Sequence, residues 1–153
     1  MGPRDGRVVP EARWETRLLG SAHEARWVER RNVALAEMTD TSEYSDRFAV
    51  AINWDGPVES ADAGLTRTED SIVAALTREN LCLYALAYLC DIERDLVFYT
   101  RSPIEAQAIV DDVQGGLPDV TLIPEVARDQ DWSDYRTRLE ASGALGSGRR
   151  TRG

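Results

Sequence analysis

Histidine and cysteine are the side chains with which a short chain would most readily perform nucleophilic or metal chemistry, and this chain has one histidine and two cysteines. His23 lies in a charged stretch with no nucleophile motif beside it, so neither a Ser–His–Asp nor a Cys–His unit is indicated. Cys82 and Cys90, with one distant histidine, do not supply a recognisable zinc ligand set. The sequence therefore predicts no catalytic residue, no metal and no other cofactor.

Acidic side chains are so numerous that pairs of them carry little information, because 27 of the 153 residues are Asp or Glu. Asp111 and Asp112 are adjacent, and Asp129 and Asp131 are two residues apart. Neither pair matches a calcium loop with its central glycine and terminal glutamate. Asp131 is instead predicted to be an acid at the N-terminus of a helix, where it interacts favourably with the helix dipole by about 0.3–1 kcal/mol.

Tyrosine and tryptophan are the best candidates for contacts with a partner, since both are enriched at the centres of protein interfaces. Trp132 and Tyr135 are three residues apart and share a face of a predicted helix. Two interpretations stay open for them: packing on the sheet to close the core, or an exposed aromatic patch ringed by acids. Tyr84 and Tyr88 fall on one face of a predicted strand, which Tyr99 extends. The predicted partner-binding residues are Tyr84, Tyr88, Tyr99, Asp131, Trp132 and Tyr135.

Charge is distributed unevenly along the chain, whose formal net charge is −9. Residues 1–31 contain seven arginines and five acids, whereas residues 32–146 contain eight arginines and 22 acids. A field this negative repels phosphate and argues against a nucleic-acid ligand. It favours a basic protein partner, or simply solubility.

Several cellular locations are disfavoured by the sequence. No stretch of about 18 apolar residues exists that would predict a membrane span. The first 20 residues lack the apolar region of a secretory signal. Cys82 and Cys90 are too far apart within one extended strand to form a disulfide, and free buried thiols are typical of a reducing compartment. We therefore expect a cytoplasmic protein.

The first elements that position these side chains follow from the spacing of apolar residues. Apolar side chains at every second position predict a strand over 47–54. Residues 58–64 are small and polar, and we expect a loop there. Thr66 is predicted to cap the first helix, with Glu69 as its capping-box partner facing water.

The segment 81–90 is ambiguous, because leucine and alanine dominate it. We interpret it as a strand, since the polar connection 91–95 joins it to 96–100, whose β-branched and aromatic residues are typical of a strand. The two strands would form an antiparallel hairpin. A helix over 81–90 stays open as an alternative, and it would remove the fold assignment.

The second helix has the clearest local pattern in the chain. Ser102 is a capping hydroxyl, Pro103 occupies the first helical position, and Glu105 follows as the capping-box partner. A short strand over 119–123, ended by Pro124, and a terminal helix that begins near Asp131 are expected to follow.

The resulting order is βαββαβ, the ferredoxin-like arrangement of an α+β fold, with an antiparallel sheet and both helices on one face. This predicts a ferredoxin-like domain over 27–142. Before it, residues 1–26 form an N-terminal extension that is partly helical or disordered, and 11–38 are expected to contain helix. A disordered basic tail over 143–153 follows the C-terminal helix.

The chain also resembles an uncharacterised bacterial family of domains of unknown function, over roughly Trp27 to Leu139. The resemblance rests on Phe98-Tyr99 at the end of the hairpin and on Asp129-x-Asp131-Trp132-x-x-Tyr135. Members of that family are similar to the ribonuclease E inhibitor B group in having a ferredoxin-like domain. The hairpin turn of this chain departs from the family pattern, with Glu93-Arg94-Asp95 in place of a Gly-Arg-Arg-like turn. The resemblance implies a fold but no defined activity, and some relatives are regulators or immunity proteins that bind another macromolecule.

Together these observations favour a non-catalytic binding or regulatory protein, of inhibitor or immunity type, that engages a basic protein surface through an acidic, aromatic face. A second hypothesis is a small-molecule-binding or enzymatic domain with its site between the sheet and the terminal segments, lined by Tyr99, Arg101 and a carboxylate. A third is a homodimer that pairs through open sheet faces.

Overall fold

A six-stranded antiparallel sheet forms the centre of this α+β fold, with its strands in the order β1-β2-β4-β5-β3-β6. The computed structural model describes residues 9–20 and 27–148. The strands are β1 (Trp14–Leu19), β2 (Trp27–Asn32), β3 (Asp46–Trp54), β4 (Cys82–Leu89), β5 (Glu93–Thr100) and β6 (Val120–Arg128). The helices are α1 (Ala61–Leu76), α2 (Pro103–Gln114) and α3 (Ser133–Gly148), with short 3-10 helices η1 (Val33–Glu37), η2 (Val58–Ser60) and η3 (Arg78–Asn80). None of the described helices is long and apolar enough to cross a membrane.

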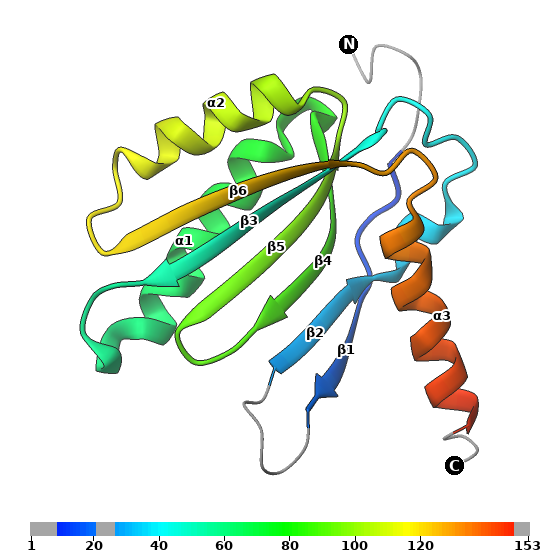
Figure 1. Cartoon of the computed structure of the whole chain (residues 1–153), viewed down its shortest axis with the longest axis horizontal. Helices are drawn as coiled ribbons and strands as arrows, with labels where there is room; N and C mark the ends of the chain where they lie inside the picture. The colour runs from blue at the N-terminus through cyan, green and yellow to red at the C-terminus, as the bar shows by residue number, and fades with distance from the viewer. Residues whose placement is uncertain (1–8, 21–26, 149–153) are drawn as a thin grey trace.

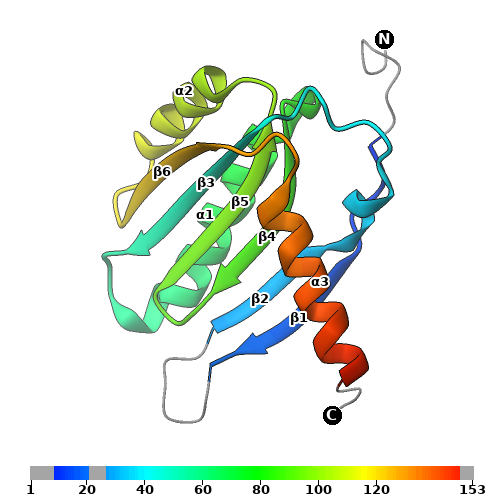
Figure 2. The ribbon, with the colours of Figure 1, turned by 45° about the vertical axis from the view of Figure 1, so that its right-hand side comes forward.

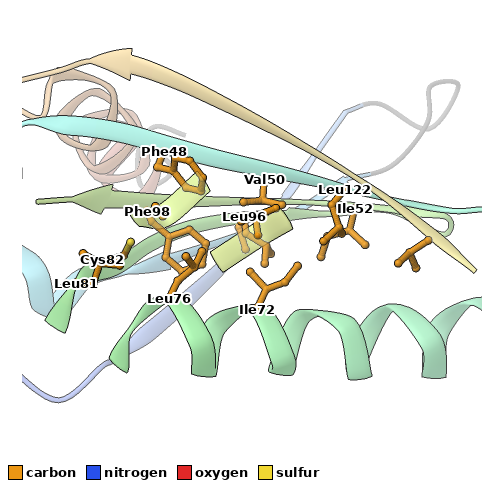
Figure 3. Packing of buried hydrophobic residues seen from close by; sticks show 14 of the residues in the cluster. Phe48, Val50, Ile52, Ile72, Leu76, Leu81, Cys82, Leu96, Phe98 and Leu122 are labelled. Atoms are coloured by element: carbon orange, nitrogen blue, oxygen red, sulfur yellow. The ribbon is translucent and has the colours of Figure 1, made fainter. Parts of the chain in front are cut away.

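Helices α1 and α2 pack on one face of the sheet, as Figure 1 shows. Alternate residues of β3 point toward them, so Phe48, Val50 and Ile52 are fully buried. Ile72 and Leu76 of α1 join these strand residues in the core that Figure 3 shows from close by. Because each such side chain contributes about 1.5–3 kcal/mol when buried, this core holds the helices on the sheet.

The opposite face of the sheet is covered only in part, by α3. Figures 1 and 2 show α3 on the side of β1, β2 and β4, whereas none of the described helices lies over β6 and most of β3 on this face. A second core between this face and α3 contains Leu86, Val97, Tyr99, Trp132 and Tyr135. The sheet is therefore a shared wall between two cores, with one open area beside α3.

Most elements from β3 to β6 occur where the apolar spacing predicted them. The strand over 47–54, the antiparallel hairpin that follows from 81–90, and the order βαββαβ are all observed, but the second hairpin strand begins at Glu93, inside the segment 91–95 that was predicted as a connection. The helical alternative for 81–90 is therefore wrong. The Ser102 hydroxyl accepts a hydrogen bond from the Glu105 backbone N–H at 3.2 Å, with Pro103 in the first turn, as the local pattern predicted.

The N-terminal part of the chain differs from its prediction. Residues 14–19, expected to lie in a partly helical or disordered extension, form β1, and β1 pairs with β2 to widen the sheet. In the described residues of the range 11–38, the expected helix is limited to the single 3-10 turn η1. Strand β2 does not follow the usual alternation of buried apolar and exposed polar residues, because the charged residues Glu29 and Arg31 occupy its buried positions.

The first helix begins earlier than the capping pattern suggested. Residues 58–64, predicted as a loop, contain η2 and the first turn of α1, so Thr66 lies inside the helix instead of capping it. Gly64 faces the Trp54 ring so closely that a Cβ atom there would lie 2.1 Å from it. This glycine therefore serves close helix–strand packing, and not a turn.

The last strand and the last helix are both longer than predicted. Strand β6 continues through Pro124 to Arg128, which is tolerated because β6 is an edge strand. Helix α3 continues to Gly148, into the segment 143–153 that was expected to be a disordered tail. Residues 149–153 of that segment lie outside the described residues.

Candidate functional site

The two tyrosines of β4 point to opposite faces of the sheet. The register of β4 against β5 shifts between Tyr84 and Leu86, where one extra residue interrupts the alternation. Tyr84 stacks on Phe98 in the core beneath α1, with ring centroids 4.9 Å apart, whereas Tyr88 packs against the core beneath α3. The prediction that Tyr84 and Tyr88 share one face is therefore wrong.

The aromatic residues Tyr99, Trp132 and Tyr135 are buried and close the core beneath α3. Tyr99 and Trp132 stack with ring centroids 4.3 Å apart, and Tyr135 meets Trp132 edge-on at 5.6 Å. The Trp132 indole N–H donates to the Tyr44 carbonyl at 2.8 Å, and the Tyr135 hydroxyl donates to the Asn32 carbonyl at 2.7 Å. Of the two interpretations of Trp132 and Tyr135, packing on the sheet is the one that the structure shows, and their side chains do not form an exposed patch.

The acid whose side chain caps α3 is Asp129. Its carboxylate accepts hydrogen bonds from the Tyr99 hydroxyl at 2.7 Å and from the backbone N–H groups of Ser133 and Asp134 at 2.8 and 3.1 Å. Burial opposes ionisation, but these hydrogen bonds outweigh it and hold the pKa of Asp129 below its usual value. Asp131 is exposed at the same helix end.

An open groove of about 620 Å³ lies on the face of the sheet that α3 leaves uncovered. Strands β3, β5 and β6 form its floor, and α3 forms one wall. Its lining combines small apolar residues with acids, two arginines and aromatic side chains: Leu19, Trp27, Arg47, Ala49, Ala51, Tyr88, Glu93, Asp95, Val97, Ile123, Pro124, Glu125 and Arg138. Tyr88 is the one predicted site residue among these.

A row of directly opposed residues runs across all six strands and passes through the groove. The members of this transverse row, from one sheet edge to the other, are Arg17, Glu29, Tyr88, Asp95, Ala51 and Ile123. Its middle members each have a buried oxygen without a hydrogen-bond partner among the described residues: Glu29 Oε2, the Tyr88 hydroxyl and Asp95 Oδ1. Buried polar atoms are normally paired. The sheet also contains unpaired Nε atoms of Arg30, Arg31 and Arg94, but the three unpaired oxygens lie next to one another on neighbouring strands.

The Glu29 part of the row is a buried ion network. Glu29 is fully buried, and its Oε1 accepts hydrogen bonds from Arg17 Nε at 3.1 Å and from Arg31 Nη1 at 3.4 Å. Its Oε2 lies 3.8 Å from Nη1 of Arg138, whose guanidinium also lies 5.3 Å from the centre of the Tyr88 ring. Burial raises the pKa of Tyr88 to about 12, so its hydroxyl stays neutral. The Arg138 guanidinium therefore forms an ion pair with Glu29 and a cation–π contact with Tyr88.

A second carboxyl group, that of Glu93, lies beside the Asp95 part of the row. Glu93 and Asp95 are two apart on β5 and both line the groove. Burial, followed by a hydrogen bond with Glu93 and the charge of Glu93, raises the pKa of Asp95 to about 7. Arg47 offsets this only in part, and its Nε donates to Asp134 on α3 at 2.9 Å. Near neutral pH, Asp95 is therefore only partly ionised.

The charges of the groove are unevenly satisfied. Its two arginines are each paired with an acid, Arg47 with Asp134 and Arg138 with Glu29. Glu93, Asp95 and Glu125 make no ion pair with any residue of the described ranges. The arrangement is suited to accept a group that is positively charged and rich in hydrogen-bond donors.

The other sequence-predicted site is not assembled. Tyr99 is buried beneath α3, whereas Arg101 lines a different pocket and donates to the Glu79 carbonyl at 3.1 Å. His23 lies outside the described residues. Cys82 and Cys90 are free thiols, and burial raises the pKa of Cys82 to about 11. Within residues 9–20 and 27–148, no group of three or more His, Cys, Asp or Glu side chains is placed to hold a metal ion.

Comparison with known proteins identifies the domain but not its role. The model of a family of unknown function, DUF695, matches residues 13–139, from the residue before β1 into α3. No curated protein matches the chain. The matched region includes the whole sheet and every residue that lines the groove.

Proposed function

The chain belongs to the DUF695 family, whose function is unknown, and we propose that it is a non-catalytic binding or regulatory protein that engages a basic segment of a partner protein in the groove. The observation that carries this proposal is the pair of neighbouring carboxyls Glu93 and Asp95, which line the groove and form no ion pair with any cation of the described residues. A guanidinium or ammonium group placed beside the two carboxyls would favour the ionised form of Asp95 and donate hydrogen bonds to both side chains.

The floor of the groove supports an arginine or lysine side chain as the group that enters. Ala49 and Ala51 are small, and Val97 beside them is apolar and buried. Long basic side chains lay their methylene stems on such surfaces while their charged heads reach polar groups. Ile123, half exposed on β6, adds an apolar rim on which neighbouring residues of the partner can pack.

The charge of the whole chain supports the same class of partner. Residues 32–146 carry 22 acids against eight arginines, and this field attracts a basic segment before contact. Association would therefore be fast at low ionic strength and slower in salt, while dissociation would depend on the contacts inside the groove. This behaviour is typical of inhibitor and immunity proteins, which form the class that we favour.

The strand order supports a more specific fold. In the order β4-β5-β3-β6, each βαβ unit has one strand of the other unit inserted between its own two strands. We infer that this part is a ferredoxin-like split βαβ domain, to which β1 and β2 are added at one edge. The free thiols Cys82 and Cys90 support a reducing, cytoplasmic location.

Fluorescence anisotropy with a dye-labelled peptide of alternating arginine and serine tests the proposal. The Glu93→Gln/Asp95→Asn variant should weaken binding by about ten-fold or more. The matched control Glu105→Gln/Asp111→Asn removes two exposed carboxylates from α2 on the other face, and should change binding by less than about two-fold. Equal losses in the two variants would mean that the peptide senses only bulk charge, and would contradict a site in the groove.

A homodimer through the same open face is the competing arrangement. It is tested by measuring the mass of the protein in solution for the wild type and for Ile123→Arg, which places a charge on the groove rim. A dimer that dissociates in this variant would assign the groove to a second copy of the chain, and would overturn the proposal of a basic partner.

A further inference from the structure

Strand β1 lies at one edge of the sheet (Figure 1), and we propose that it pairs with β1 of a second copy of the chain, antiparallel and centred on Thr16. The two sheets would then join into one continuous sheet across a two-fold axis. Three features of β1 support this pairing: the direction of its backbone groups, the order of its charges and the exposure of its apolar side chains. Because none of them involves the carboxyls of the groove, the pairing is independent of the proposed function.

The backbone of β1 presents hydrogen-bonding groups at its outer edge at every second residue. The Val33 N–H donates to the Arg13 carbonyl at 2.8 Å, so Arg13 and Val33 form a hydrogen-bonded pair at the start of the ladder between β1 and β2. Such pairs alternate along antiparallel strands, and Trp14, Thr16 and Leu18 therefore direct their N–H and C=O groups away from β2. No backbone group of the described residues bonds to them there. A second β1 strand centred on Thr16 would present the same outward groups in return, so that all three residues find partners.

The charges of β1 are complementary to themselves in this register. Glu15 and Arg17 are the only charged residues of the strand, and they stand on either side of Thr16. The pairing places Glu15 of each copy opposite Arg17 of the other, which gives two identical pairs of opposite charges. Opposite charges on facing strands are stabilising, and like charges are destabilising. The Glu15 side chain contacts Arg31 at 3.3 Å but is 61% exposed, so it is accessible to a second arginine. Charges that commonly keep edge strands apart here favour a second copy.

The other face of β1 carries two exposed apolar side chains that this pairing covers. Trp14 is 37% exposed and Leu18 is 58% exposed. Centring on Thr16 places Leu18 of each copy opposite Trp14 of the other. Their contact removes apolar surface from water twice, once on each side of the two-fold axis.

Trp14 is already held in position for such a contact. Its ring centroid lies 4.7 Å from that of Tyr84, and the Arg30 guanidinium lies 5.5 Å from the centre of its ring. Arg30 donates a hydrogen bond to Glu69, which is buried and does not face water as its sequence position suggested. A side chain that is ordered before association loses little conformational freedom on binding. Trp14 therefore offers a fixed surface to Leu18 of the second copy.

Sedimentation equilibrium of the full chain over a wide range of concentrations tests this proposal. We expect a reversible dimer, which Glu15→Arg should weaken by about ten-fold or more because it sets two pairs of like charges opposite each other. Glu105→Arg makes the same change of charge at an exposed position of α2, and should weaken the dimer by less than about two-fold. A wild type that is monomeric at every concentration, or equal losses in the two variants, would overturn the proposal.

Thr16→Pro is a second variant, for the case that Glu15→Arg disturbs Arg31 and the fold. The Thr16 N–H points away from β2, so proline at this position leaves the ladder between β1 and β2 intact but blocks the centre of the proposed pairing. Circular dichroism verifies that the variant is folded. A folded Thr16→Pro variant that dimerises like the wild type would exclude this edge.

The register is tested by cross-linking at the two-fold axis. Thr16 is the residue that stands opposite its own copy, and Cα atoms of such a hydrogen-bonded pair are about 5.5 Å apart. Thr16→Cys in a Cys90→Ser background should therefore be joined rapidly into a covalent dimer by a short bismaleimide reagent. Ile104→Cys in the same background, at an exposed position of α2, is the control. Cross-linking that is no faster at residue 16 than at residue 104 would contradict the pairing.

Two further variants separate this proposal from the proposed function. Glu93→Gln/Asp95→Asn should dimerise like the wild type, and Thr16→Pro should bind the arginine–serine peptide like the wild type. Ile123→Arg should also leave the dimer intact, because β6 is at the opposite edge of the sheet. A dimer that is lost in Ile123→Arg and retained in Thr16→Pro would overturn the pairing through β1.

Discussion

Tyr88 on β4 and Asp95 on β5 stand directly opposite each other in the sheet, and each has a buried oxygen with no hydrogen-bond partner among the described residues. The pKa of Asp95 is raised to about 7, and the hydroxyl beside it is neutral. Burying polar groups without hydrogen-bond partners lowers the stability of the folded protein. Sites that bind ligands often hold such groups ready, because the ligand supplies the missing partner.

The stability of the protein should depend on the proton of Asp95. Its pKa is about 7 in the folded chain against 3.8 for an unperturbed group. The folded state therefore binds more protons between these values, so the stabilisation is fully present below about pH 4 and is lost as the pH rises toward 7. Asp95→Asn should remove this dependence, whereas Asp111→Asn, at an exposed position of α2, should retain it. Urea denaturation at a series of pH values measures the effect, and a wild-type stability that rises from pH 4 to 7 in step with Asp95→Asn would contradict it.

Removing the hydroxyl of Tyr88 and that of Tyr135 should change the free energy of unfolding differently. Tyr88→Phe should leave the free energy of unfolding unchanged or raise it, because its hydroxyl has no partner in the part of the chain that the structure describes. Tyr135→Phe should lower the free energy by about 1 kcal/mol, because it removes the hydrogen bond to the Asn32 carbonyl. Both variants are compared with the wild type by chemical denaturation, and a larger loss for Tyr88→Phe than for Tyr135→Phe would show that Tyr88 has a partner after all.

An element could be predicted from the sequence when the residues that determine it are close together in the chain. The second helix was predictable, since Ser102, Pro103 and Glu105 act within one turn. Strand β2 was not, because Glu29 and Arg31 are charged residues at buried positions, and they are compensated by each other and by Arg17 and Glu15 across the pairing with β1, which the sequence did not predict.

The candidate site was harder to predict than the fold for the same reason. One extra residue between Tyr84 and Leu86 exchanges the faces of β4, and nothing in that apolar run marks the place. Spacing put Trp132 and Tyr135 on one helix face but left their burial undecided. The alternation Glu93-x-Asp95 was visible, but Arg138 joins that groove only through the packing of α3.

Gly64→Ala should destabilise the protein although alanine favours helix formation. An added Cβ would lie 2.1 Å from the Trp54 ring, whose indole N–H is held by the Pro57 carbonyl at 2.8 Å. Overpacking of this kind costs about 1–3 kcal/mol, which exceeds the gain in helix propensity of about 1 kcal/mol. Thermal denaturation of Gly64→Ala, Trp54→Leu and the double variant provides the check. Strict additivity of the two changes would show that the glycine does not serve the contact with the ring.

Asp129→Ala should loosen α3 at its first turn. The variant loses the cap on Ser133 and Asp134 and the hydrogen bond from Tyr99, and helix caps contribute about 0.5–2 kcal/mol. Because the pKa of Asp129 is lowered in the folded state, its contribution is present above the ordinary carboxyl pKa and is lost as the pH falls through the folded value. Hydrogen exchange of the α3 amides at neutral and acidic pH measures both effects. Asp131→Ala, at the exposed acid of the same turn, is the control and should change exchange little.

Pro124 limits the pairing of strand β6 with strands of other molecules. Strand β6 is the outer strand of the sheet, with Ile123 and Val126 about half exposed on it, and such a strand can recruit the strands of other molecules into growing fibrils. Proline in its middle has no N–H to offer an incoming chain and interrupts that recruitment. An exposed apolar rim on the groove is thereby compatible with a sheet edge that resists the addition of further strands.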